Sequence, residues 1–354
     1  MAKESTILRV NLFLSAYSWS VPLNSDGVRQ HVAALYEEVF RDFDLRIFPK
    51  SLSHGFITDV IRHFLVLPFG KFNVLSQGYP FATGALWTWL QRDLGLIVHT
   101  WKVPGLSDER LTAKINDTLL RRVISSARAV VVVSMTQKRQ LESMKISCPV
   151  FFARVSVDSQ FWHSDAFRSP GVLKKFGLER GAYVLTAGGP DRDEVYAAQV
   201  AKLFGLTYVR ASWDNNTTKR SIQVLASNNL DAHAQILENP TDIELRSLYA
   251  NSFLVCLPTL TRTNPAGLTS LVTAMACESV VAVPDSIAEG YVNDGVNGFI
   301  LSDSPSDFVA RLRTKVDTFD SVRRMAREFA QNHLNNFIVA RELRSQLSLA
   351  NILR

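Results

Sequence analysis

The sequence predicts an α/β fold in which parallel strands are covered by helices on both faces. Short apolar, β-prone runs recur along the chain, and two of them, Phe253–Leu257 and Val280–Val283, are separated by a helical segment. These runs are continuous rather than alternating, which is typical of parallel strands that are buried on both faces. The chain has 354 residues, more than one hydrophobic core usually holds, so we expect two domains.

The composition narrows the classes of function. The chain is 47% hydrophobic and 20% charged, as in ordinary globular proteins, and no apolar run reaches the roughly 18 residues of a membrane span. A formal net charge of +6 fits nucleic acid, an anionic membrane surface or a phosphate-bearing ligand. Because no basic run carries interleaved aromatic residues, we expect no nucleic acid partner. Cys148, Cys256 and Cys277 have no metal-ligand spacing, so we expect buried thiols, a reducing compartment and no metal site.

In the first half of the chain, we expect strands that alternate with helices. The strands are expected at Ile7–Leu14, Leu45–Phe48, Phe72–Leu75, Leu96–Val98, Ala129–Ser134 and Phe151–Val157. Helical spacing or position predicts helices over Val28–Val39, Arg110–Ala127 and Met135–Met144. Gly27 precedes the first helix, where a glycine lets the backbone approach a phosphate. Asp26 and Gly27 also fit a simple helix cap.

Two further features of the first half have alternative interpretations. His99 directly follows a predicted strand, so it is expected at the ligand-binding edge of the sheet, although it also fits a loop histidine bonded to a carbonyl. The segment Ile57–Val74 mixes apolar and basic residues and is interrupted at Pro68–Gly70. It fits a core-facing helix that leads into a strand, and it also fits a basic amphipathic patch on an anionic membrane.

The second half repeats the alternation. Strands are expected at Tyr183–Ala187, Leu206–Ala211, Ala234–Leu237, Phe253–Leu257, Val280–Val283 and Phe299–Leu301. Helices are expected from Glu194, over Ile243–Tyr249, from Gly267 to Cys277, over Pro305–Val316 and in the tail Asp320–Leu353. Asn215–Thr218 is expected to be a polar loop.

Two turns in the second half have the character of phosphate sites. Gly188 and Gly189 follow a strand and precede a helix, and the guanidinium fork of Arg192 suits paired phosphate oxygens. The alternative for Arg192 is an ion pair with Asp193 or Glu194 on a solvated face. The second helix start, near Gly267, offers unpaired backbone N–H groups at the carboxyl end of a parallel strand.

Five segments, in this order along the chain, resemble the retaining GT-B glycosyltransferases grouped as family 4. The segments are DGVRQHVAALYEEV, VHTW, GGPDRD, LVTAMACESVVAV and IAEGYVNDGVNGFI. The resemblance implies two doubly wound, Rossmann-like domains that face a central cleft. Residues 1–165 would form the acceptor-side domain, residues 166–335 the nucleotide-sugar domain, and residues 336–354 a helix that crosses back to the first domain.

The resemblance also implies an activity of the hexosyltransferase type. A sugar would move, with retention of configuration, from a UDP- or GDP-linked donor to a hydroxyl of a glycan, glycolipid or other acceptor. No metal or other cofactor is expected, and the location would be cytoplasmic, at the inner face of the membrane. His99 and Arg192 would be the catalytic residues. The donor-binding residues would be Gly27, Gly188, Gly189, Arg192, Asn264, Gly267, Leu268, Thr269 and Thr273.

The sequence departs from the family at two residues that are expected to bind the donor. The family usually has two glutamates eight positions apart, which bind the sugar and the ribose, whereas this chain has Pro265 and Thr273. A carboxylate accepts two hydrogen bonds from vicinal hydroxyls, which neither replacement can do. A catalytically degenerate, GT-B-like binding or regulatory subunit is therefore the alternative to an enzyme.

Overall fold

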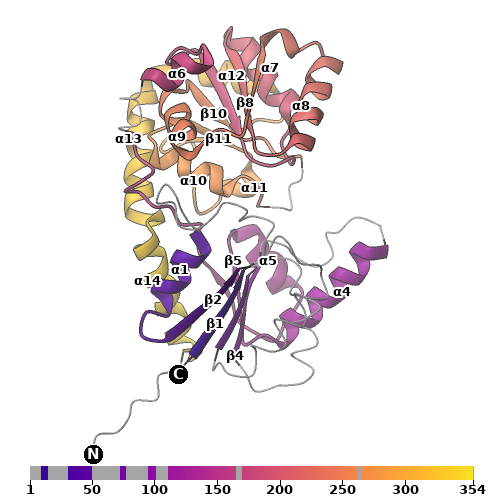
Figure 1. Ribbon diagram of the computed structural model, residues 1–354, viewed down its shortest axis with the longest axis vertical. Coiled ribbons are helices and arrows are strands. Elements are labelled where there is room, and N and C mark those ends of the chain that lie inside the picture. Colours follow the sequence, from indigo (N-terminus) through magenta and orange to yellow (C-terminus); the bar gives the residue numbers. More distant parts are fainter. Residues whose placement is uncertain are drawn as a thin grey trace, which may run out of the picture. The chain divides into compact units, whose positions relative to one another are not determined.

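The computed structural model describes residues 9–14, 31–49, 72–76, 95–100, 111–164, 170–260 and 265–353. The chain divides into two compact units (Figure 1). Unit 1 comprises Met1–Ser156 together with Asn336–Arg354, and unit 2 comprises Val157–Asn335. Unit 2 is thus a continuous segment whose two ends both connect to unit 1.

The described strands of unit 1 form one parallel sheet in the order β2-β1-β3-β4-β5-β6. They lie where the apolar runs predict them. Their bounds are β1 (Arg9–Leu14), β2 (Asp44–Pro49), β3 (Phe72–Ser76), β4 (Gly95–Thr100), β5 (Ala129–Val132) and β6 (Val150–Phe152). The strand order reverses between β1 and β3, so the topological switch point of this sheet is at their carboxyl ends.

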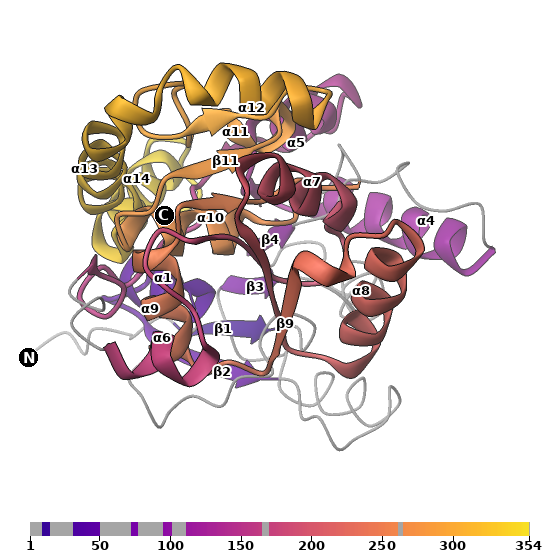
Figure 2. The same cartoon turned by 90° about the horizontal axis from the view of Figure 1, so that it is seen from above.

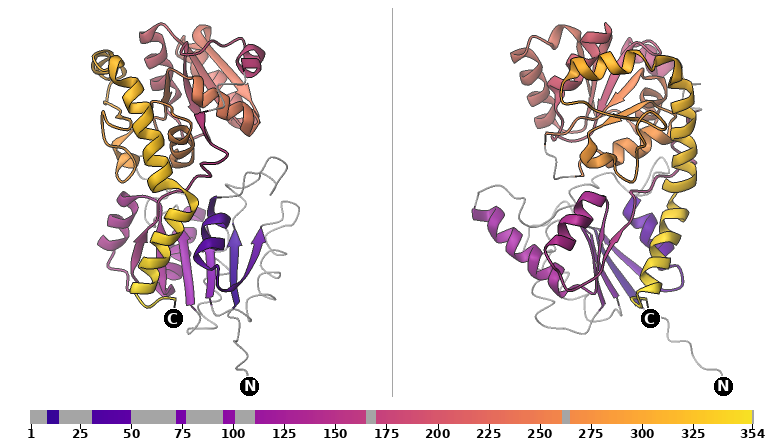
Figure 3. Two further views of the ribbon diagram at one scale, coloured as in Figure 1. Left: turned by 90° about the vertical axis from the view of Figure 1, so that its left-hand side faces the viewer. Right: turned by 180° about the vertical axis from the view of Figure 1, so that it is seen from behind.

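Helices that are distant in sequence complete unit 1. Its described helices are α1 (His31–Val39), α4 (Leu111–Ser126), α5 (Met135–Ser143) and α14 (Asn336–Leu349). The C-terminal helix α14 packs against α1 (Figures 1 and 3). Buried Leu35, Tyr36 and Val39 of α1 share one core with Val339 and Leu343 of α14. Unit 1 therefore depends on both ends of the chain.

Unit 2 contains a second parallel sheet, in the order β12-β11-β10-β7-β8-β9. Its strands are β7 (Tyr183–Ala187), β8 (Thr207–Ser212), β9 (Ala234–Glu238), β10 (Leu254–Cys256), β11 (Val281–Val283) and β12 (Phe299–Ile300). The strand order reverses between β7 and β10, which are hydrogen-bonded neighbours. The switch point of unit 2 therefore lies at the carboxyl ends of these two strands, where open α/β sheets bind ligands.

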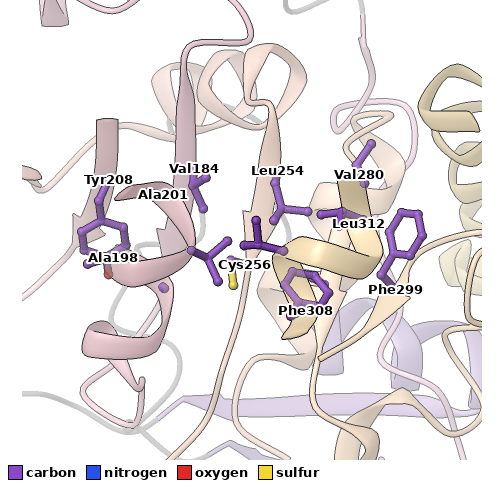
Figure 4. Packing of buried hydrophobic residues seen from close by; sticks show 14 of the residues in the cluster. Val184, Ala198, Ala201, Tyr208, Leu254, Cys256, Val280, Phe299, Phe308 and Leu312 are labelled. Carbon is purple, nitrogen blue, oxygen red and sulfur yellow. The ribbon is translucent and has the colours of Figure 1, made fainter. Parts of the chain in front are cut away.

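The helices of unit 2 lie on both faces of this sheet. They are α6 (Pro170–Phe176), α7 (Glu194–Phe204), α8 (Asn215–Ser227), α9 (Asp242–Asn251), α10 (Leu268–Ala276), α11 (Asp285–Ala288), α12 (Pro305–Arg313) and α13 (Phe319–Phe329). On one face, Val184, Leu254 and Cys256 share a core with α7 and α12 (Figure 4). On the other face, the hydroxyl of Tyr183 donates to the carbonyl of Leu248 in α9 at 2.6 Å. Neighbouring strand residues thus bury their side chains in opposite layers, as a pleated strand requires.

The expectation of a polar loop at Asn215–Thr218 is wrong. These residues form the first turn of α8, which lies beside β9 (Figure 2). Asp214 caps the helix, because its Oδ1 accepts a hydrogen bond from the backbone N–H of Thr217 at 2.8 Å. Several of the buried residues of α8 are small and polar, such as Thr217, Thr218 and Ser221, so the helix lacks the apolar periodicity by which helices are predicted.

The two ends of unit 2 are tied to each other. The N–H of Val157 donates to the carbonyl of Leu334 at 2.7 Å, and Val157 forms an isolated parallel bridge with Asn335. The amide Nδ2 of Asn335 also donates to Oγ of Ser159 at 2.9 Å. Chain entry and exit are therefore adjacent in this unit.

Two expectations from composition can be compared with the structure. Cys148, Cys256 and Cys277 are buried and free, as predicted, and burial raises the pKa of each thiol. In the described ranges, no helix combines the length and the apolar character that a membrane span requires. Residues 57–71 lie outside the described ranges, so both interpretations of that segment stay predictions.

Candidate functional site

The candidate site lies at the switch point of unit 2, where two loops leave the carboxyl ends of β7 and β10. Three hydrogen bonds join these loops. Oγ1 of Thr186 donates to the carbonyl of Cys256 at 2.8 Å, and the N–H of Asp193 donates to the carbonyl of Pro258 at 3.1 Å. Oγ of Ser270, in the first turn of α10, donates to the carbonyl of Ala187 at 3.2 Å. The glycine turn after β7 and the start of α10 therefore form one local structure.

Two glycines leave room for one guanidinium. Gly188 has φ +120° and Gly267 has φ +103°, values that side chains other than that of glycine rarely tolerate. A Cβ on Gly188 would lie 2.4 Å from Nη2 of Arg192, and a Cβ on Gly267 would lie 3.5 Å from the same atom. The guanidinium of Arg192 thus lies beside both glycines, which brings three of the sequence-predicted residues together.

Arg192 is buried, at 5% exposure. Its Nε donates to the carbonyl of Ala187 and its Nη1 to the carbonyl of Asp191, both at 3.2 Å. Among the described residues, no carboxylate forms an ion pair with Arg192. The alternative of an ion pair on a solvated face is therefore wrong.

The two acidic residues that follow Arg192 bind groups other than its guanidinium. Asp193 caps α7, because its Oδ1 accepts from the N–H of Tyr196 at 3.0 Å. Glu194 is buried and forms an ion pair with Nε of Arg210 at 2.9 Å. Each carboxylate is engaged by a group other than Arg192.

The charge of Arg192 is buried beside that of Arg210. Burial, and then the neighbouring charge of Arg210, lower the pKa of Arg192 to about 10. Arg192 therefore remains charged at neutral pH. The neighbouring charge of Asp191 acts on this pKa in the opposite direction. Glu194 pairs with Arg210 and not with Arg192, and a buried charge without an ion-pair partner is costly. An anion at this switch point would offset that cost.

The start of α10 adds backbone donors. Gly267 is the N-cap and supplies no side chain, so the N-cap residue itself leaves the first N–H groups of the helix, such as those of Thr269 and Ser270, without a side-chain cap. The N–H of Leu268 makes only a long bond of 3.4 Å to the carbonyl of Pro265. Free N–H groups and the positive end of a helix dipole both favour a phosphate. The side chain of Leu268 itself is buried, so only its backbone can contribute to binding.

Pro265 and Thr273, which stand where the family has its paired glutamates, offer no carboxylate to a sugar or ribose hydroxyl. The hydroxyl of Thr273 donates to the carbonyls of Thr269, at 2.8 Å, and Ser270, at 3.2 Å. It also hydrogen-bonds Tyr249, whose pKa burial raises to about 12. The hydroxyl of Thr273 is therefore held within its own helix and by Tyr249.

Arg210 was missed by the sequence analysis. It is the only charged residue in the predicted strand Leu206–Ala211, and its side chain is fully buried. Nη2 of Arg210 donates to the carbonyls of Gly188, at 3.0 Å, and Gly189, at 2.8 Å. A charged residue inside an otherwise buried strand is a signal in itself, because such a residue must find partners. Its partners could not be named from the sequence.

Three predicted site residues are placed only in part. His99 lies in β4 of unit 1, with Ser76 and Val131 as its neighbours in the sheet register, and its side chain is not among the described parts. Gly27 and Asn264 lie outside the described residues. Their roles stay predictions. The described residues contain no group of three or more His, Cys, Asp or Glu side chains that could hold a metal ion.

Comparison with known proteins identifies the fold. No protein-family model matches this chain, and no curated protein matches it in sequence. Among solved structures, sucrose-phosphate synthase from Thermosynechococcus elongatus has a TM-score of 0.75 at 13% identity, with 97% of this chain and 98% of that chain covered. Anabaena HepE, crystallised with UDP and glucose, has a TM-score of 0.72 at 14% identity, with 97% and 100% covered.

A third structure agrees with these two. The UDP-forming trehalose-phosphate synthase from Burkholderia xenovorans has a TM-score of 0.67 at 7% identity, with 96% of this chain and 100% of that chain covered. All three are GT-B glycosyltransferases. The chain therefore has the GT-B fold, an α/β architecture with two parallel sheets, as the sequence predicted.

Proposed function

We propose that the chain is a glycosyltransferase that uses a nucleoside-diphosphate sugar as donor, of the retaining type found in family 4. One observation supports this most strongly: Arg192 is buried at the switch point of unit 2, and within the described ranges its hydrogen bonds go to carbonyls and no carboxylate pairs with it. A diphosphate would supply the missing negative charge. Arg192 has hydrogen bonds from Nε and Nη1 to carbonyls, whereas Nη2, beside Gly188 and Gly267, has no acceptor in the described structure.

The same groups would act on the reaction. As the bond to the sugar breaks, negative charge develops on the leaving diphosphate, and preorganised donors stabilise this charge most where water is excluded. In our proposal Arg192 and the N–H groups at the start of α10 are those donors. The sugar would pass through an oxocarbenium-like species, and the acceptor hydroxyl would attack from the same face while its proton moves to the leaving phosphate. His99 would orient the sugar.

The comparisons support a choice of donor. HepE has been crystallised with UDP and with UDP-glucose, and the Burkholderia synthase is described as UDP-forming. We therefore propose a UDP-linked hexose as donor, ahead of a GDP-linked one. The acceptor would be a hydroxyl of a glycan or of a lipid-linked glycan, reached in the cytoplasm or at its membrane face.

A second candidate function rests on Pro265 and Thr273. The proline has no side-chain acceptor, and the threonine hydroxyl is bonded to carbonyls of its own helix. Losing a hydrogen bond to a charged acceptor costs about 1.5–3 kcal/mol. A GT-B-like subunit that binds a nucleotide sugar without turnover would show this pattern, and so would an enzyme whose donor lacks the usual hydroxyls.

Isothermal titration calorimetry with UDP, GDP and their hexose conjugates tests the donor site. We expect the wild-type protein to bind at least one nucleoside diphosphate. We expect Arg192→Ala to weaken that binding by at least about 50-fold, because more than one charge-assisted hydrogen bond is lost. Arg324→Ala is the matched control, since Arg324 is an exposed arginine in the same unit with no recorded partner. Equal binding by the wild type and Arg192→Ala would contradict the proposal.

Release of free nucleotide from the conjugates separates the two candidates. Turnover, whether onto water or onto an added glycan, indicates an enzyme. Tight binding with no release across the whole panel of donors and acceptors favours the degenerate subunit.

A further inference from the structure

Five consecutive carbonyl oxygens, from the last residue of β7 into the turn that follows it, accept hydrogen bonds from side chains. Arg192 Nε and Ser270 Oγ donate to Ala187, both at 3.2 Å. Arg210 Nη2 donates to Gly188 and Gly189. Nη1 of Arg220 donates to Pro190, and Nη1 of Arg192 donates to Asp191, each at 3.2 Å. Five consecutive carbonyls, in the segment Ala187–Asp191, are thus engaged by three arginines and a serine.

Arg210 is the central donor of this set. Its Nη1 donates to the carbonyl of Ala211 at 2.5 Å, and its Nε is paired with Glu194. Oε1 of Glu194 also accepts from Oγ of Ser221 at 2.6 Å. The guanidinium is therefore fixed from β8, α7 and α8 while Nη2 spans two successive carbonyls. A lysine has no planar fork and could not reproduce this geometry.

These hydrogen bonds reduce the electrostatic repulsion between the carbonyls of the turn and an anion. Carbonyl oxygens carry partial negative charge, so a turn with free carbonyls repels an anion that approaches its N–H groups. Donors that bind all five oxygens neutralise this charge and also fix the turn, in which Gly188 has φ +120°. The N–H groups of the turn and the guanidinium of Arg192 can then bind a phosphate without opposing charge from these carbonyls.

We propose that Arg210 is a positioning residue of the donor site, because it fixes the turn after β7 and neutralises the carbonyls of Gly188 and Gly189 that would otherwise repel a diphosphate. The inference rests on the proposed function, because it specifies how the donor diphosphate is bound. Arg210 acts through the two glycine carbonyls and not by contact with the ligand, since Nε, Nη1 and Nη2 each donate to a group within the protein.

The probe is inorganic pyrophosphate, titrated into the full-length protein by calorimetry. We expect Arg210→Lys, which keeps the charge, to weaken binding at least tenfold. The effect should be smaller in an Arg192→Lys background, because both residues act on the same turn and coupled sites are not additive. An equal loss in both backgrounds would indicate general destabilisation and would overturn the inference.

The remaining outcomes are also decisive. If the wild type binds neither pyrophosphate nor any nucleoside diphosphate, the proposed function fails and the inference with it. If the wild type binds pyrophosphate and Arg210→Lys binds it equally well, the inference alone fails.

If Arg210→Lys does not fold, a substitution of an exposed arginine tests the inference instead. Arg220→Gln removes the donor to Pro190 from an exposed side chain, and Lys219→Gln removes the same charge one residue away, where no partner is recorded. We expect binding of pyrophosphate to weaken two- to fivefold in Arg220→Gln and less than that in Lys219→Gln. Equal effects of the two substitutions would overturn the inference.

Discussion

Gly188 controls the position of the Arg192 guanidinium. Its φ of +120° is a conformation that only glycine adopts without strain, and the absence of a Cβ leaves the space that Nη2 of Arg192 occupies. A methyl group there would meet the guanidinium at 2.4 Å. Since the guanidinium is the flexible partner, it would have to move away from the two loops.

We therefore expect Gly188→Ala to weaken pyrophosphate binding at least tenfold and to lower the free energy of unfolding by about 1–3 kcal/mol, the cost of a strained backbone conformation. Calorimetry and urea denaturation measure the two effects. Gly189→Ala is the matched control: its φ is not positive, and a Cβ there would meet nothing within 4 Å. An equal loss of binding in both variants would contradict this account of Gly188.

Among the helices, α8 shows how a polar segment can be helical. Asp214 caps it through the N–H and hydroxyl of Thr217, and these hydrogen bonds, with the side-chain one first, lower the pKa of the carboxyl group. A carboxyl group with a depressed pKa in the folded state contributes stability at neutral pH. This contribution disappears as the pH falls from the unfolded-state value, about 3.9, through the folded-state value.

We expect Asp214→Asn to leave stability at pH 7 almost unchanged, because asparagine is an equally good N-cap. The substitution should reduce the loss of stability between pH 4 and about 2, where the aspartate would become protonated. Asp214→Ala, by contrast, should cost about 1 kcal/mol at pH 7. Urea denaturation across this pH range measures all three proteins, and identical pH profiles for Asp214→Asn and the wild type would contradict the role of the charge.

The elements that could be predicted from the sequence are those with a local signature. The strands of both sheets are short continuous apolar runs. The start of α9 can be predicted because Thr241 and Glu244, three residues apart, form a capping box. Helix α8 lacks such a pattern, and so it was missed. At the site, the glycine pair and Arg192 follow one another in sequence and could be predicted.

The rest of the site depends on contacts that no local pattern encodes. The partners of Arg210 at this site, Glu194 and Gly188, lie 16 and 22 residues before it, and Ser270 lies 83 residues from the carbonyl that it binds. That Arg192 lacks a carboxylate follows only from where Asp193 and Glu194 direct their oxygens. Only the folded chain shows these facts.

At the scale of the whole molecule, the C-terminal segment belongs to the first unit. Buried Leu343 and Leu347 of α14 lie in the same core as Tyr36 and Phe40 of α1, and the carboxylate of Glu342 pairs with Arg154 at 3.3 Å. Unit 1 can therefore complete its core only after α14 has been made.

We expect Leu343→Ala to destabilise unit 1 by about 2–5 kcal/mol, the usual cost of a large cavity in a core. Hydrogen exchange read by mass spectrometry should show faster exchange in α1 and β5 while β7 and β10 keep their protection, because those strands belong to unit 2. Leu349→Ala is the control, since that side chain is 82% exposed. Uniformly faster exchange in both units would contradict their independence.

The bridge between Val157 and Asn335 has a practical consequence. Because the ends of unit 2 meet, this part of the protein resembles an insertion that could be excised in one piece, and the gap left in its host could be closed with a short peptide. A gene fragment for residues 157–335 should then yield a small autonomous protein that keeps Arg192, Arg210 and both glycine turns. The binding of pyrophosphate could be measured on that fragment alone, in the absence of unit 1.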